Sequence, residues 1–372
     1  MNLWSDYNPV RITSGPGAID RLFSLDPPVI TGKRILMVTS AGFTARGVTE
    51  KIEARARKAS LENPILVFDG VTANPELDFL DRIIIALRRE SITGIIALGG
   101  GSVLDTAKIF SVALPSDLEI PLDMVLRQKR PQVWKNHIPV VAIPTTAGTG
   151  AEVTPFATVW DIRNKKKHSV SGDMVYPVHA LLDPELTVTL PPKETLYTGL
   201  DAISHALESL WNKNCTPVSE ALALKALTLA SKALPAIINQ PDRLYYREMM
   251  QQAALMAGLA ISRTRTAIAH AISYPVTMRF GVPHGLACSF TLPGLIKHYT
   301  HALDHGPIKT VIHEILKTVE ELNLENEMAI YIGEENLSEY IEEMFHPDRI
   351  GNYSGILTDD DISRLVLFKT EK

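Results

Sequence analysis

The stretch GIIALGGGSVLDTAKIFSVAL, residues 94–114, decides how the first half of the chain folds. Residues 94–98 form a short apolar run, which is typical of a buried strand. Three glycines follow, and from Ser102 onward the apolar residues take the spacing of a helix. The stretch therefore predicts a strand, a glycine turn and a helix, which is the repeating step of a parallel α/β sheet.

The same alternation runs through the sequence around this stretch. We expect further strands at residues 34–39, 64–68 and 140–143, and helices at residues 47–60 and 77–90. Because these strands are apolar along nearly their whole length, both faces of the sheet should be covered by helices.

The second half of the chain has a different character. After Pro191 and Pro192, residues rich in Ala, Leu and Met follow a helical period. The helices that we expect span residues 193–211, 217–239, 243–261, 307–322 and 338–345. This pattern predicts an α/β dinucleotide-binding domain over residues 1–186 and an all-helical domain over residues 187–372.

Composition narrows the class of protein. The chain has 372 residues, of which 45% are hydrophobic, and its net charge is −5. These values favour a globular protein and argue against nucleic acid or an anionic membrane as the main partner. Only Cys215 and Cys288 are cysteines, so no thiol cluster is expected, and the N-terminus lacks the pattern of a signal peptide. We expect a cytoplasmic protein without a membrane span.

The glycine turn suits a nucleotide pyrophosphate. Gly99, Gly100 and Gly101 let the backbone approach a phosphate closely, and the helix after them offers free N–H groups. Ser102 and Asp105 have the spacing of a capping pair. The turn lacks the G-x-G-x-x-G pattern, so a plain strand–helix turn remains an alternative.

A second loop, PTTAGTG at residues 144–150, follows the expected strand at 140–143 directly. Its three threonines, Thr145, Thr146 and Thr149, suit a cofactor that lies across the carboxyl ends of parallel strands. The alternative is a polar loop with ordinary turn chemistry.

Four residues in the helical half could hold a metal ion. Asp201 and His205 are four apart, so on a helix they share one face. His270 and His284 follow, the latter in a Pro/Gly turn. One carboxylate and three imidazoles suit Fe(II) or Zn(II), whereas the alternative is a set of separate core or surface histidines.

These segments together resemble the iron-containing, or group III, alcohol dehydrogenases. The matching motifs are GGGSVLDTAK (99–108), PTTAGTGAEVT (144–154), LLDPELT (181–187), GLDAISHALES (199–209) and VPHGLA (282–287). They keep the family's order over about residues 8 to 300. The resemblance implies the fold shared with dehydroquinate synthase. It also implies a metal-dependent, NAD(P)-linked enzyme that transfers hydride between nicotinamide and a small aldehyde or primary alcohol.

The resemblance also assigns roles to residues of this chain. It implies Fe(II) or Zn(II) on Asp201, His205, His270 and His284, with His284 also counted as catalytic. It implies cofactor contacts from Gly99, Gly100, Gly101, Ser102, Asp105, Thr145, Thr146, Thr149, Asn74 and Lys167. The helical domain would then carry the metal and the substrate, and we expect a homo-oligomer, specifically a dimer.

Two positions depart from the family pattern. Tyr274 stands where many members have a second histidine that lies near the nicotinamide and relays a proton. Its reference pKa of about 10, against about 6.5 for histidine, puts that relay in doubt. Ser40 stands at the end of the strand predicted at residues 34–39, where NAD-preferring members often have an Asp. Without that carboxylate, NADP(H) becomes a plausible cofactor.

A narrower resemblance concerns the substrate. WSDYNPVRI and SRTRTAIAHAISYPV, residues 4–12 and 262–276, look like the phosphonoacetaldehyde reductase branch of the family. Arg263 and Arg265 could bind a phosphonate, because guanidinium groups bind oxyanions bidentately. If this stretch is one helix, Arg263 is nearly in register with His270. The alternative is that both arginines cap a helix or face solvent.

Two other functions fit the same sequence. A carbon–oxygen lyase of the dehydroquinate synthase type would use NAD without consuming it. A non-catalytic binding member of the fold would need no metal, although all four ligand positions are filled here.

Overall fold

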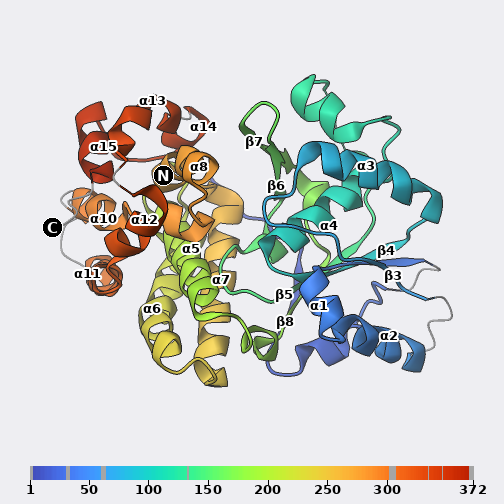
Figure 1. Cartoon of the computed structure of the whole chain (residues 1–372). Helices are drawn as coiled ribbons and strands as arrows, with labels where there is room; N and C mark the ends of the chain where they lie inside the picture. The colour runs from blue at the N-terminus through green and yellow to red at the C-terminus, as the bar shows by residue number, and fades with distance from the viewer. Residues whose placement is uncertain are drawn as a thin grey trace. The chain divides into compact units, whose positions relative to one another are not determined.

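The computed structural model describes residues 3–30, 34–59, 64–131, 134–300, 307–333, 335–345 and 347–367. They form two compact units (Figure 1). The sheet unit comprises Asn8–Thr146 and Ala151–Thr187, and the helical unit comprises the described parts of Met1–Tyr7, Ala147–Gly150 and Val188–Lys372. The expected fold class is confirmed, whereas the division into domains at residues 1–186 and 187–372 stays a prediction.

A parallel sheet forms the centre of the sheet unit. In spatial order its described strands are β1 (Arg11–Ser14), β8 (His179–Leu182), β5 (Val140–Pro144), β4 (Gly94–Gly99), β2 (Ile35–Val38) and β3 (Leu66–Phe68). All neighbouring strands in this sheet are parallel. The helices of this unit are α1 (Ala41–Ala45), α2 (Val48–Lys58), α3 (Leu77–Leu87) and α4 (Gly101–Ala113).

Both faces of this sheet are covered, as the apolar strands predict. Side chains alternate along β2, so Leu36 and Val38 join one cluster with residues of α3 and α4, whereas Ile35 and Met37 join another with Ile52 of α2. Figure 1 shows α3 and α4 on one side of the strands and α1 and α2 on the other. The inner strands β2, β4, β5 and β8 are therefore buried on both faces, whereas the edge strands β1 and β3 are partly exposed.

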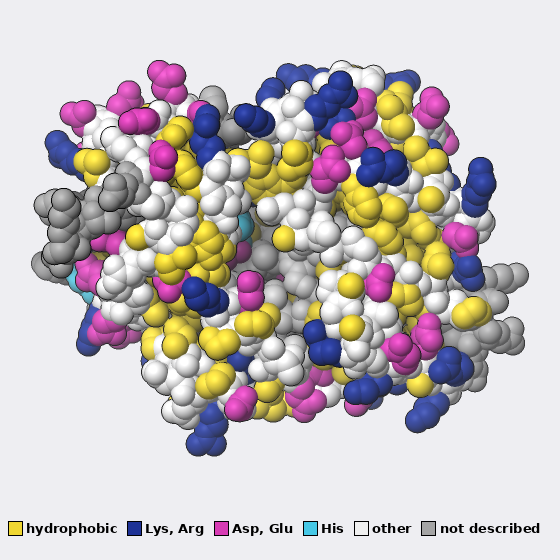
Figure 2. All heavy atoms as spheres, in the orientation of Figure 1, with side chains coloured by type: hydrophobic (Ala, Val, Ile, Leu, Met, Phe, Trp, Pro, Cys, Tyr) yellow, Lys and Arg dark blue, Asp and Glu magenta, His cyan; other side chains and the backbone are white. Residues whose placement is uncertain are grey.

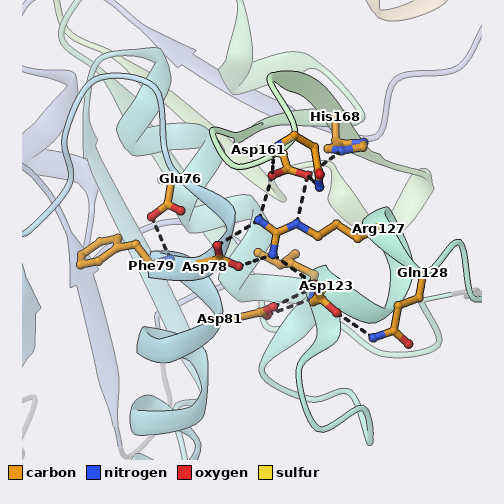
Figure 3. Close-up of polar contacts among 11 residues, drawn as sticks. Glu76, Asp78, Phe79, Asp81, Asp123, Arg127, Gln128, Asp161 and His168 are labelled. Carbon is orange, nitrogen blue, oxygen red and sulfur yellow. Dashed lines mark hydrogen bonds and ion pairs between the residues drawn. The ribbon is translucent and has the colours of Figure 1, made fainter.

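An antiparallel hairpin, β6 (Phe156–Asp161) and β7 (Lys166–Ser171), belongs to the same unit. The sequence patterns did not predict it. Arg127 fixes the hairpin, because its guanidinium bonds Asp161 at the end of β6 at 2.8 and 3.0 Å and also pairs with Asp78 of α3 (Figure 3). A partly buried ion-pair network therefore ties the hairpin to α3, and its residues Ala157, Val159 and Val170 pack into the apolar core with α3 and α4.

The helical unit is built around three long helices, α5 (Pro192–Leu210), α6 (Pro217–Asn239) and α7 (Leu244–Thr264), which pack against one another. The other described helices are α8 (Ile268–Phe280), α9 (His284–Ala287), α10 (Leu292–Thr300), α11 (Pro307–Glu321), α12 (Leu324–Ile332), α13 (Ile341–Met344), α14 (Pro347–Ile350) and α15 (Asp359–Val366). Their buried side chains form one continuous apolar core.

By length and composition, α6 is the one helix among the described residues that could cross a membrane. Its alanines and leucines, including Ala223, Leu227 and Leu234, lie in the core of the helical unit. It is a partly buried core helix of this unit. On the face drawn in Figure 2, basic and acidic side chains are interspersed rather than gathered into one patch.

Candidate functional site

The helix α5 carries the first two predicted ligands. Pro191 and Pro192 begin it, and its apolar face packs into the core of the helical unit. Asp201 and His205 lie one turn apart, so Oδ1 of Asp201 is 3.6 Å from Nε2 of His205. Both side chains are buried.

His270 joins this pair from the first turn of α8. Its Nε2 is 3.6 Å from Oδ1 of Asp201, and its ring stacks on that of His205 with 4.8 Å between centroids. Glu208 of α5 accepts hydrogen bonds from the backbone N–H groups of Ala269 and His270 at 2.6 and 3.2 Å. This carboxylate therefore caps the start of α8 and fixes where His270 stands.

His284 begins the short helix α9, directly after Pro283. Its ring centroid is 5.3 Å from that of His270. A Cβ at Gly285 would overlap the carbonyl oxygen of Tyr197 in α5, so only glycine allows this close approach. The approach brings His284 to the same place as Asp201, and all four predicted ligands thus gather in the helical unit.

Several polar atoms of this group are buried without a hydrogen-bond partner among the described residues. They are Oδ1 of Asp201, Nε2 of His270 and Nδ1 of His205. Asp201, His270, His284 and Cys288 can each offer one donor atom, and these four atoms lie within 4.8 Å of one another. A divalent cation would satisfy such atoms, whereas leaving them unpaired is costly.

The charges of the group also suit a cation. Burial alone would raise the pKa of Asp201, but the nearby histidines hold this pKa well below its usual value. Burial lowers the pKa of His205, which favours the neutral ring that can bind a metal. Burial would also raise the pKa of Glu208, yet His270 brings it below its usual value. Two buried carboxylates therefore face a set of imidazoles.

Two residues of this group were not predicted. Glu208 follows Asp201 by seven residues, so it shares the same face of α5, and this spacing could have indicated it. Cys288 follows His284 by four residues, a spacing that places the two side chains close together. The prediction considered only thiol clusters and left a single cysteine aside.

The two predicted nucleotide loops follow the carboxyl ends of β4 and β5 in the sheet unit, and Ser40 follows that of β2. The strand order reverses between β2 and β4, because β3 lies beyond β2 and β5 lies beyond β4. The hydroxyl of Thr39 donates to Leu98 O at 2.8 Å, and Thr145 N donates to Gly99 O at 3.0 Å, which joins these three strand ends. Such a reversal point is where open α/β sheets bind nucleotides.

The helix α4 begins at this reversal point with Gly100 as its N-cap, a residue without a side chain that could cap it. Its first N–H groups therefore suit a pyrophosphate. The predicted capping pair of Ser102 and Asp105 is wrong. Asp105 instead accepts from Thr158 N at 2.8 Å and lies 3.5 Å from the buried Lys108, because the hairpin β6–β7 packs against α4.

The remaining cofactor candidates lie in different surroundings. Ser40 is half-buried and begins α1 just after β2. Asn74 is exposed, with a positive φ of 58°. Lys167 of β7 has its Nζ 5.3 Å from the centroid of the Trp160 ring. Thr146 follows Thr145 in the sheet unit, whereas Thr149 lies in the segment 147–150 that packs with the helical unit.

The catalytic and substrate candidates lie near the predicted ligands in sequence. Tyr274 is half-buried on α8, one turn after His270. No single helix connects Arg263 with His270, because α7 ends at Thr264 and Arg265 adopts a φ of 61°, so the condition for their shared register is not met. Arg263 lies 3.2 Å from Asp6, and Arg265 is exposed.

Comparison with known proteins adds a separate line of evidence. Residues 9–184 match the family model for iron-containing alcohol dehydrogenase, and residues 195–360 match the one for the C-terminal part of the Fe-containing alcohol dehydrogenase family. Phosphonoacetaldehyde reductase of Streptomyces viridochromogenes is 37% identical over 287 residues, which cover 76% of this chain and 71% of the relative.

Two further relatives support the same similarity. NAD-dependent methanol dehydrogenase of Bacillus methanolicus is 33% identical over 264 residues, which cover 71% of this chain and 68% of the relative. The crystal structure of sulfoacetaldehyde reductase from Bifidobacterium kashiwanohense in complex with NAD+ has a TM-score of 0.86 at 27% identity, and the match covers 98% of each chain.

Proposed function

The chain belongs to the iron-containing alcohol dehydrogenase family, and from this premise we propose that it is a metal-dependent, NAD(P)H-linked reductase of small aldehydes. The family assignment confirms the expected enzyme class, an NAD-dependent alcohol dehydrogenase. It also favours an oxidoreductase over the lyase and over the non-catalytic member that the sequence left open.

One observation carries the proposal. Oδ1 of Asp201 and Nε2 of His270 are buried, lie 3.6 Å apart and have no hydrogen-bond partner among the described residues. We assign Asp201, His205, His270 and His284 as the ligands of Fe(II) or Zn(II). When bound, such an ion acts as a Lewis acid on the substrate oxygen, and the nicotinamide supplies the hydride.

The residues of this chain would bind the cofactor, orient the metal ligands and protonate the product. Glu208 holds His270 by its Nδ1 atom, which leaves Nε2 for the metal. The open N-terminus of α4 and the loops at Thr145 and Thr146 would hold the pyrophosphate. Tyr274, one turn from His270, is the protein residue that we propose to pass a proton to the product oxygen.

For the natural substrate we propose an aldehyde that carries an anionic group, such as phosphonoacetaldehyde. Nη2 of Arg263 is buried without a hydrogen-bond partner in the described part of the chain, so the guanidinium retains a donor for an oxyanion. Two similar proteins are named for phosphonoacetaldehyde and sulfoacetaldehyde, which are both anionic aldehydes. Arg265 is the second candidate for this contact.

A panel of aldehydes tests the proposal. Purified protein is loaded anaerobically with Fe(II) or with Zn(II) and assayed with NADH and NADPH on phosphonoacetaldehyde, sulfoacetaldehyde and propanal. We expect stoichiometric consumption of reduced nicotinamide, with the highest kcat/KM on the anionic aldehydes. Highest kcat/KM on propanal would contradict the anionic substrate, and no turnover on any aldehyde would contradict the reductase.

We further propose that the enzyme works in the cytoplasm as a homodimer. This proposal rests on the composition of the chain and on its family. We propose neither nucleic acid nor a membrane as a partner. Light scattering at several protein concentrations measures the oligomeric state, and a stable monomer would contradict the dimer.

A further inference from the structure

We propose that the thiol of Cys288 is an additional ligand of the metal ion and that its sulfur shifts the site toward zinc. The inference rests on the proposed metal site but names a donor that the family resemblance does not supply. It predicts a property of this chain that Asp and His ligands alone would not give, namely a metal–thiolate bond.

The geometry of the Cys288 side chain points to this role. Sγ lies 3.5 Å from Nδ1 and 3.6 Å from Nε2 of His284, and the side chain is fully buried. Zinc binds sulfur at about 2.3 Å and imidazole nitrogen at about 2.0–2.1 Å, so two such donors on one tetrahedral ion lie about 3.5 Å apart. The observed separation is that of two donors that share an ion.

The neighbouring donors provide a second observation. Oδ1 of Asp201 and Nε2 of His270 belong to the same compact set as Sγ of Cys288, and both are buried without a hydrogen-bond partner among the described residues. A buried cysteine more often packs as a small apolar residue. Here the donor atoms of three ligating side chains lie within 4.8 Å of the sulfur, which is the environment of a ligand.

The backbone holds the sulfur in this position. Cys288 N donates to His284 O at 2.9 Å, which continues the turn of α9, and Cys288 O accepts from the Ser204 hydroxyl at 3.2 Å. Ser204 lies between Asp201 and His205 on α5. The same helix that carries two ligands therefore also fixes the backbone of the cysteine.

Binding of the metal by Cys288 requires the thiolate form of its side chain. The thiol loses its proton to solvent as the sulfur–metal bond forms, and the metal keeps its oxidation state. Thiolate is a soft donor that suits zinc better than Fe(II). The sulfur would join the donors of Asp201, His270 and His284, which lie within 4.8 Å of it.

Cobalt(II) is the probe for the test, because a thiolate bound to Co(II) gives a near-ultraviolet charge-transfer band and nitrogen or oxygen donors do not. The full-length protein is loaded with Co(II), and its spectrum is compared with those of Cys288→Ser and Cys288→Ala. Cys215→Ser is the matched control, because Cys215 is the other cysteine and lies just before α6. We expect the band in the wild type and in Cys215→Ser, and its loss in both Cys288 variants.

A metal competition adds a quantitative readout. With equimolar Fe(II) and Zn(II) under anaerobic conditions, the ratio of bound zinc to bound iron should fall about tenfold or more in Cys288→Ser, since losing even an outer contact of a metal site costs about 10–100-fold in affinity. An unchanged ratio would contradict the preference for zinc.

The outcomes separate this inference from the proposed function. If Co(II) binds with visible d–d bands but without the charge-transfer band, or if the band survives in Cys288→Ser, the thiolate ligand is wrong and the Asp and His site stands. If the wild type binds no Co(II), both the site and the thiolate ligand are wrong.

Discussion

The carboxylate of Glu208 lies 2.6 Å from Nδ1 of His270, and both side chains are buried. The same carboxylate accepts the backbone N–H groups of Ala269 and His270. A buried carboxylate is stable only when it is paired and hydrogen-bonded, and here its partners are the ring and backbone of one proposed ligand. Glu208 is therefore a positioning residue, because it sets the tautomer and the orientation of His270.

Replacing Glu208 by Gln should weaken metal binding while preserving the shape of the side chain. Loss of such an outer contact typically lowers metal affinity by about 10–100-fold. Competition with a chelator measures the metal Kd, and Glu194→Gln, at an exposed position of α5, is the control. If Glu208→Gln binds metal as tightly as the wild type, the carboxylate only caps α8.

Replacing His205 by Ala should remove the metal and the turnover without unfolding the protein. His205 lies 3.6 Å from Asp201 and stacks on His270, so the substitution removes one donor from the group. Metal content, turnover and circular dichroism are the measurements. His313→Ala, at an exposed position of α11, should change none of them. Near-wild-type turnover with stoichiometric metal in His205→Ala would show that the assignment is wrong.

The wild type should use NADPH at least as well as NADH, because Ser40 leaves no carboxylate at the end of β2. Ser40→Asp should shift the preference toward NADH by repelling the 2′-phosphate. Ser40→Asn introduces a side chain of nearly the same size as Asp but without its charge, so it should shift the cofactor preference little. The ratio of kcat/KM for the two cofactors measures the effect, and a wild type that strongly prefers NADH would contradict the prediction.

Asp161 gives a prediction about acid stability. Its hydrogen bonds to Arg127 hold the pKa of this carboxyl well below its usual value. A lowered pKa in the folded state stabilises the protein above the unfolded pKa of about 3.9, and this contribution is lost as the pH falls below that value. Asp161→Asn should therefore cost about 1.5–3 kcal/mol near neutral pH, the range for a hydrogen bond to a charged group.

Thermal midpoints at neutral pH and at about pH 3, below the unfolded pKa of Asp, check this prediction. The difference between the wild type and Asp161→Asn should shrink at the lower pH. A difference that stays constant or grows would mean that Asp161 contributes packing rather than charge.

The parallel sheet could be predicted because its signal is local. Apolar strands followed by glycine turns occupy single short segments, and residues 94–114 fold as a strand, a turn and a helix as expected. The proposed metal ligands could be listed for a related reason, since Asp201 and His205 are one helical turn apart. The part of the chain that carries them also matches the C-terminal model of the family.

Other features depend on contacts between distant segments and left no local signal. The loop residues 147–150 pack with the helical unit, because Gly150, at a φ of 62°, stands against Gly258 of α7, where a side chain would collide. The predicted capping pair failed for a similar reason. Asp105 binds the hairpin β6–β7, which no periodic pattern indicated. The spacing from Asp201 places Glu208 on the same face of α5, but its role depends on the start of α8, which lies beside it only in the folded chain.

Arg263 carries the proposal of an anionic substrate, and its neighbours allow a sharp test. Its Nε lies 3.2 Å from Asp6, its guanidinium lies 5.7 Å from the ring of Tyr7, and its Nη2 is buried without a partner among the described residues. Arg263→Ala should lower kcat/KM for an anionic aldehyde by about ten- to a hundredfold, as expected for a contact of about 1.5–3 kcal/mol. It should leave propanal nearly unaffected.

Asp6→Asn is the control that separates binding from structure, because it breaks the same ion pair but keeps the arginine. If Arg263 binds the anionic group of the substrate, Asp6→Asn should retain activity on the anionic aldehyde, because the guanidinium remains and loses a competing carboxylate. If both variants lose activity on anionic and neutral aldehydes alike, the ion pair stabilises the fold instead. If Arg263→Ala changes neither substrate, the arginine has no part in binding, and the anionic aldehyde loses its physical support in this chain.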